Sequence, residues 1–90
     1  MFKNLEELIA VIRERKDTLN EKSYTKKLLN SKKLCVEKVK EEVAELIDSI
    51  EKNSKKVHES ADVLYHLMVL LEANDIKIED VMDELKKRQK

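Results

Sequence analysis

Residues 57–73 read VHESADVLYHLMVLLEA, and this stretch decides the fold because it predicts a helix with apolar side chains on nearly every face. One small chain cannot cover that many sides of a helix. We therefore expect a second copy of the chain to pack against it in a homodimer. Within the same stretch Glu59, Asp62 and His66 follow one another at i, i+3 and i+7 and form a polar stripe on a helix that otherwise favours burial.

Amphipathic segments ahead of this stretch predict further helices. Asn4 is expected to cap a first helix that runs to about residue 16, and a polar, aperiodic loop is expected over residues 17–22. Ser23 is expected to cap a short helical piece, and a long amphipathic helix is predicted over residues 32–50. The half of the chain before residue 57 is therefore predicted to be helical.

The segments around residues 57–73 complete the architecture. A polar connector is predicted over residues 51–56, with Asn53 as its turn residue and Ser54 as the cap of the next helix, and a last helix is predicted from about Ile78. Short connections between long helices favour antiparallel neighbours. The predicted fold class is all-α, a single domain over residues 1–90 built as an antiparallel bundle of four main helices plus a short helical piece.

The composition agrees with a helical protein and argues against some classes of binding partner. The chain has no glycine and no proline, so it lacks the residues that favour sharp turns, whereas Leu, Lys, Glu and Ala favour helix. Its 19 basic side chains balance 19 acidic ones, so no bulk attraction to nucleic acid or to acidic membranes is expected. The single cysteine and the lack of a basic-then-apolar leader predict a cytoplasmic protein.

Clustered carboxylates are the strongest functional signal. Glu41, Glu42 and Glu45 lie within an arc of about 100° on the helix predicted over residues 32–50. Burying ionised carboxylates is costly unless a cation or hydrogen-bond donors compensate them. If the two long helices are antiparallel, Glu42 and Glu45 can share a space with Glu59 and Asp62, an all-oxygen ligand set that suits Mg²⁺.

Simpler interpretations compete with this one. An acidic run on a lysine-rich helix is usually a solvated face. A single histidine such as His66 is more often a hydrogen-bonded core or interface residue than a ligand or base. Tyr65 beside it is most simply a packing residue with a tethered hydroxyl. Two acidic segments on two neighbouring helices, one of them the most apolar of the chain, raise the weight of the metal hypothesis.

Three motifs resemble the phosphoribosyl-ATP pyrophosphatase family: Ser-Tyr-Thr at 23–25, Lys-Val-x-Glu-Glu-x-x-Glu at 38–45, and Glu-Ser-Ala-Asp-Val-Leu-Tyr-His-Leu at 59–67. The similarity covers nearly the whole chain. The acidic motifs alone are shared with the wider MazG-like group of all-α nucleotide pyrophosphohydrolases, whereas the Ser-Tyr-Thr and Tyr-His elements are more specific. The chain departs from the family at Lys22 and Lys40, where glycine is common.

The resemblance implies hydrolysis of the α,β phosphoanhydride of phosphoribosyl-ATP to phosphoribosyl-AMP and pyrophosphate, the second step of histidine biosynthesis. It implies Mg²⁺ as the cofactor. The implied metal ligands are Glu42, Glu45, Glu59 and Asp62. Glu41 is implied to act with Glu42 and Glu45 in catalysis, as an outer ligand or by orienting water.

Other side chains of the chain are expected, from their chemistry, to bind the substrate of this reaction. Basic side chains are expected to contact phosphate, and the Ser-Tyr-Thr motif is expected to order the nucleotide end. The expected substrate-binding residues are Arg13, Ser23, Tyr24, Thr25, Lys27, Lys38 and His66.

Two alternatives remain open on the sequence. A MazG-like pyrophosphohydrolase acting on another nucleoside triphosphate would share every proposed metal ligand, and substrate profiling separates it from the first reading. A non-catalytic helical dimerisation module would have its acids solvated and would be indifferent to Mg²⁺.

Overall fold

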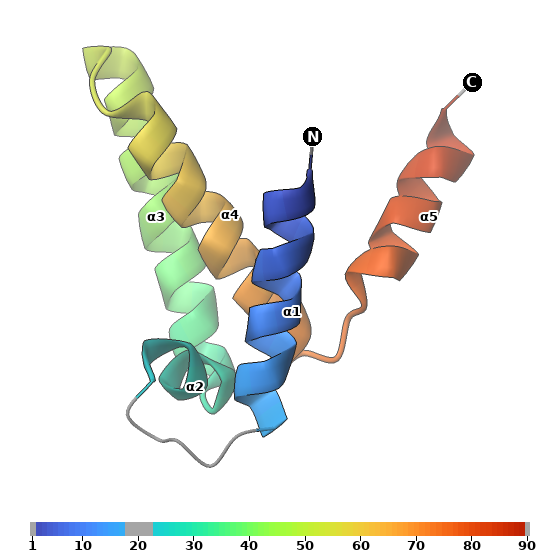
Figure 1. The fold of residues 1–90 in the computed structure, drawn as a ribbon. Coiled ribbons are helices and arrows are strands. Elements are labelled where there is room, and N and C mark those ends of the chain that lie inside the picture. Colours follow the sequence, from blue (N-terminus) through green and yellow to red (C-terminus); the bar gives the residue numbers. More distant parts are fainter. Residues whose placement is uncertain (1, 18–22, 90) are drawn as a thin grey trace.

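The computed structural model describes residues 2–17 and 23–89, and within these residues it is helical with no strand (Figure 1). The helices are α1 (Lys3–Asp17), α2 (Tyr24–Leu29), α3 (Lys32–Lys52), α4 (Lys56–Ala73) and α5 (Ile78–Arg88). The all-α prediction, with four main helices and one short piece, is confirmed. The loop predicted over residues 17–22 lies, from residue 18 on, outside the described residues. No described helix is long and apolar enough to cross a membrane.

An antiparallel hairpin of α3 and α4 forms the centre of the fold, and these two helices make the most extensive contact between any two (Figure 1). Asn53 ends α3 in the left-handed conformation, with φ 53°, as expected of a turn residue. The predicted cap of α4 is wrong. Because the chain reverses within residues 53–55, the cap position falls on Lys55, which has φ 59° and makes no side-chain capping bond, instead of Ser54.

Side-chain caps define two of the other helix starts. The hydroxyl of Ser23 caps α2, as predicted, and the hydroxyl of Ser31 caps α3. The predicted cap of α1 is wrong, because the carbonyl of Phe2 already accepts the first amide hydrogen bonds and Asn4 lies inside the helix.

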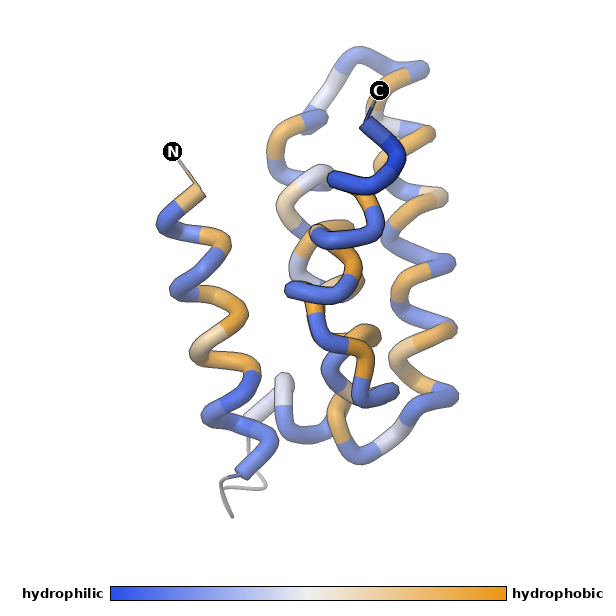
Figure 2. The backbone as a smooth tube through the Cα atoms, turned by 90° about the vertical axis from the view of Figure 1, so that its right-hand side faces the viewer, coloured by the Kyte–Doolittle hydropathy of each residue, from blue (hydrophilic) through white to orange (hydrophobic). Residues whose placement is uncertain are grey.

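The core lies where α1, α2 and α3 meet the lower half of α4. Few apolar side chains of the described residues are buried, and α4 supplies half of them: Ile12, Leu28, Cys35, Met68, Val69 and Ala73. Apolar and polar residues alternate along the helices with the spacing of amphipathic elements (Figure 2). The prediction of α4 as the buried helix is therefore confirmed for its second half, where the buried residues are His66, Met68, Val69 and Ala73.

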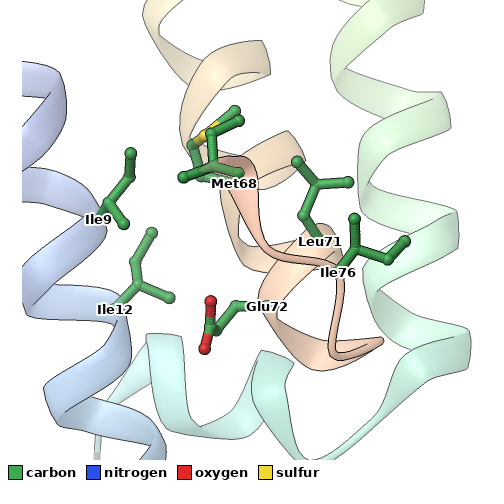
Figure 3. A pocket seen from close by; sticks show the side chains of 7 residues that line it. Ile9, Ile12, Met68, Leu71, Glu72 and Ile76 are labelled. Carbon is green, nitrogen blue, oxygen red and sulfur yellow. The ribbon is translucent and has the colours of Figure 1, made fainter. Parts of the chain in front are cut away.

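Beside this core, a small apolar recess lies between α1 and the end of α4 (Figure 3). Ile9, Ile12, Met68 and Leu71 line it, and the carboxylate of Glu72 points toward α1. The recess offers about 10 Å³, which is room for no more than one water molecule. A nucleotide therefore has to bind elsewhere.

The last helix, α5, stands apart from the α3 and α4 pair, beyond α1 (Figure 1). None of its described residues is buried, and Met82 and Leu85 of its apolar stripe are half-exposed. Its main tie to the rest of the chain is polar, because the Arg13 guanidinium donates to both carboxylate oxygens of Glu79 at 3.0 and 2.6 Å. This contact lowers the pKa of Glu79 to about 2. The helix was expected inside the bundle. It differs because its four apolar residues offer too little area for an 11-residue helix to be buried against α1 or α4.

Candidate active site

The hairpin brings the predicted acids to one side of the molecule in two groups. Within each group the atoms that could bind a metal all lie within 4.8 Å of one another. The groups are Glu41, Glu42 and Glu45 on α3, and His58, Glu59 and Asp62 on α4. The helical spacing of the sequence thus places each acidic motif on one face of its helix.

Charges of the two groups act on each other across the hairpin. Glu42 is the most buried of them, with 9% of its surface exposed. Burial raises the pKa of its carboxyl group, and the negative charges of Glu45 and Asp62 raise it further. The pKa of Glu59 is raised by burial and then by Glu45. Because each helix perturbs acids of the other, the carboxylates face a common space.

Two carboxylate oxygens in this space lack the partners that a buried charge needs. Glu42 Oε2 and Glu59 Oε2 are both shielded from solvent, and neither has a hydrogen-bond partner among the described residues. A buried carboxylate oxygen without a donor is strongly unfavourable. A divalent cation between α3 and α4 would compensate both atoms, and a set made of carboxylate oxygens fits Mg²⁺. The residues present therefore fit the predicted metal.

The basic residues predicted to bind phosphate lie in different places. Lys38 lies on the acidic side of α3, with its Nζ 3.4 Å from Glu41 Oε2. Lys27 is exposed on α2. Arg13 is not brought to the carboxylates, because its guanidinium is bound to Glu79 and, at 3.4 Å, to Glu72. Of the three, Lys38 is the one that the structure places beside the acids.

The hydroxyl-bearing residues predicted to bind the nucleotide instead contact one another. Ser23 caps α2. The Tyr24 hydroxyl lies 2.9 Å from Nε2 of His66, and the Thr25 hydroxyl lies 2.5 Å from that of Tyr65. Both pairs join α2 to α4 about one helical turn after Asp62.

Two further residues lie in this region, and the sequence predicted one of them. Tyr65 was expected to be a packing residue with a tethered hydroxyl, and its hydroxyl pairs with Thr25. His58 was not considered, yet its Nε2 lies 3.4 Å from Oδ2 of Asp62. The i, i+4 spacing of His58 and Asp62 on a helix was the signal that could have found it.

The chain is similar to known proteins over most of its length. The family model for phosphoribosyl-ATP pyrophosphohydrolase matches residues 5–89. The phosphoribosyl-ATP pyrophosphatase of Haloarcula marismortui is 42% identical over 90 residues, covering 94% of this chain and 92% of the relative. That of Methanococcoides burtonii is 40% identical, covering 94% and 91%. The histidine biosynthesis bifunctional protein HisIE of Pyrococcus furiosus is 44% identical over 96% of this chain, which spans 41% of that longer relative.

Proposed function

The chain belongs to the phosphoribosyl-ATP pyrophosphohydrolase family. From this premise we propose that its reaction uses Mg²⁺ and that the ion is bound by Glu42, Glu45, Glu59 and Asp62. The reaction is the hydrolysis of phosphoribosyl-ATP to phosphoribosyl-AMP and pyrophosphate in histidine biosynthesis. We also propose a cytoplasmic location, which suits an enzyme whose substrate is a free nucleotide.

One observation carries the metal proposal. Glu42 Oε2 and Glu59 Oε2 come from neighbouring helices, are buried, and lack a partner within the described residues. Glu45 and Asp62 add negative charge around them. A bound Mg²⁺ supplies charge neutralisation for the triphosphate and lowers the pKa of a bound water molecule.

Residues of the chain itself would orient the reactants. Glu41 is exposed and lies beside Glu42 and Glu45, and in this proposal its carboxylate accepts a hydrogen bond from the attacking water. Lys38 lies beside it, and the negative charge of Glu41 raises the pKa of the Lys38 amine, so this side chain stays positively charged for contact with phosphate. Hydrolysis by water needs no covalent nucleophile, and buried Cys35 is not required.

The proposal predicts that pyrophosphate release from phosphoribosyl-ATP depends on Mg²⁺. Release should fall to background when the ion is removed with EDTA and return when Mg²⁺ is added in excess, because the carboxylates cannot approach a triphosphate without a cation. Pyrophosphate release is measured with a coupled colorimetric assay.

The same assay with dUTP and dCTP is the control for substrate. Much faster release from either than from phosphoribosyl-ATP would support the MazG-like alternative. Indifference to Mg²⁺ with no release from any nucleotide would support the non-catalytic alternative.

We further propose that a second copy of the chain covers the apolar surface of α3. The exposed residues of this stripe are Val36, Val43, Ile47 and Ile50, and Val57 and Leu64 of α4 are also exposed. In the described residues nothing packs over them. A stripe of this length on a helix that already packs on α4 is typical of an interface between helices. The proposed dimer interface therefore lies mostly on α3, whereas the sequence predicted it on α4.

Replacing Ile47 with glutamate should separate the dimer, since it places a charge at the centre of the stripe. Sedimentation equilibrium should give about twice the chain mass of 10.6 kDa for the wild type and the single-chain mass for Ile47→Glu. Ala44→Glu adds the same charge at an exposed position of α3 beside the stripe and should remain dimeric. A wild-type protein with the single-chain mass at micromolar concentration contradicts the proposal.

A further inference from the structure

The contact between α2 and α4 contains two side-chain hydrogen bonds that join hydroxyl groups of α2 to aromatic residues of α4. Tyr24 pairs with His66 at 2.9 Å, and Thr25 pairs with Tyr65. The rings also pack on one another, with centroids 4.9 Å apart for Tyr65 and His66 and 5.9 Å apart for Tyr24 and His66. We define these four residues as the α2–α4 clamp.

The hydrogen bonds of His66 determine which atom donates and which accepts in the bond between Tyr24 and His66. Nδ1 of His66 lies 2.8 Å from the backbone carbonyl oxygen of Asp62. A carbonyl oxygen only accepts, so Nδ1 carries the proton and, in the neutral ring, Nε2 accepts the hydroxyl proton of Tyr24. Both ring nitrogens of this buried side chain are therefore occupied within the protein. A substrate would have to break one of these bonds to use His66.

The clamp contacts the proposed metal site through Nδ1 of His66. This nitrogen donates to the backbone carbonyl of Asp62, whose carboxylate is a proposed ligand. Like charges on α3 and α4 repel and favour separation of the two helices. A rigid contact beside them opposes that separation.

On these grounds, and resting on the function proposed above, we propose that Tyr24 and His66 are positioning residues for the metal ligands, with Thr25 and Tyr65 as the second bond of the clamp. The structure assigns them this role in place of the substrate contact that the sequence suggested. Hydrogen bonds that orient ligands from behind commonly change metal affinity by about 10- to 100-fold. The clamp acts on the backbone of Asp62, so a smaller effect is expected.

Tyr24→Phe tests the proposal because it removes one hydroxyl and leaves the ring in place. Binding of Mn²⁺ to the nucleotide-free protein, followed by the electron paramagnetic resonance of the free ion, should weaken by roughly 3- to 10-fold, below the usual effect of direct ligand partners. At saturating Mg²⁺, kcat should fall while KM for phosphoribosyl-ATP stays within about twofold, on the same reasoning.

His66→Asn is the second variant. An asparagine can still donate to the carbonyl four residues earlier, as Asn74 does to Leu70 at 2.8 Å, but it cannot reach Tyr24. Tyr24→Phe and His66→Asn break the same hydrogen bond. The variant that carries both changes should therefore bind Mn²⁺ no more weakly than whichever single variant has the lower affinity. Ile12→Ala truncates a fully buried side chain on α1, outside the clamp. It is the control for lost stability and should keep the wild-type Mn²⁺ affinity in its folded state.

Opposite results overturn the proposal in a recognisable way. Unchanged Mn²⁺ affinity in Tyr24→Phe together with a raised KM would make Tyr24 a substrate contact. Equal weakening of Mn²⁺ binding in Ile12→Ala would mean that the effect reflects only the general stability of the fold. If the wild type itself bound no Mn²⁺, the proposed metal site would be refuted as well. If the wild type bound Mn²⁺ and Tyr24→Phe bound it equally well, only the positioning role of the clamp would be refuted.

Discussion

Replacing Glu42 with glutamine should lower kcat/KM for phosphoribosyl-ATP by at least about a hundredfold, the scale expected when one preorganised charge contact is lost. The same change should raise the melting temperature of the metal-free protein. The side chain is buried, one of its oxygens has no partner among the described residues, and Glu45 and Asp62 repel it. Glutamine keeps the shape of the side chain and removes its charge. The site therefore loses one metal-binding carboxylate, and the fold loses the unfavourable burial of a negative charge.

The pH dependence of this effect follows from the raised pKa of Glu42. A carboxyl group whose pKa is higher in the folded than in the unfolded state destabilises the fold once it is ionised. Its unfavourable contribution is absent below the unfolded pKa and appears as the pH rises through the folded pKa. The gain in melting temperature should therefore be present at neutral pH and disappear in acid.

Calorimetry with and without Mg²⁺ provides the measurement for Glu42→Gln. Added Mg²⁺ should raise the melting temperature of the wild type, because the ion binds only the folded state, and should have little effect on the variant. Glu37→Gln, a change of the same kind at an exposed position of α3, should alter neither stability nor turnover. Unimpaired hydrolysis by Glu42→Gln would refute the proposed ligand set.

Replacing Leu28 with alanine should remove about 2–5 kcal/mol from the free energy of unfolding, the range for a buried leucine. Leu28 is fully buried, belongs to the six-residue α2, and is one of a small set of fully buried apolar side chains. Small domains have stabilities near the lower end of about 5–15 kcal/mol. The variant should therefore be substantially unfolded at moderate temperature and low concentration.

Urea denaturation of Leu28→Ala, followed by circular dichroism, measures this loss. Val11→Ala is the control, because Val11 is an apolar residue of α1 with 43% of its surface exposed, and it should cost far less. Equal losses in the two variants would mean that Leu28 has no special place in the core. A loss that shrinks as protein concentration rises would show that the homodimer contributes to stability.

The pattern of the sequence predicted the helices well because a helix depends mainly on residues close to it in the chain. The start of α3 at Lys32, the turn at Asn53 and the start of α5 at Ile78 all agree with the structure. Ser54 and Asn4 were assigned wrongly as caps, because capping depends on the backbone angles of one residue, which the side-chain pattern does not specify.

The sequence by itself determined the all-helical fold, the family, and the placement of each acidic motif on one helix face, since these follow from helical periodicity and local motif identity. Only the tertiary structure decided that Glu42 is buried while its neighbour Glu41 is exposed. It also decided that Arg13 binds Glu79, 66 residues away, and that Tyr24 binds His66, 42 residues away. Such contacts depend on the angles and register at which helices cross, and these are set by packing of the whole core, which no local pattern encodes.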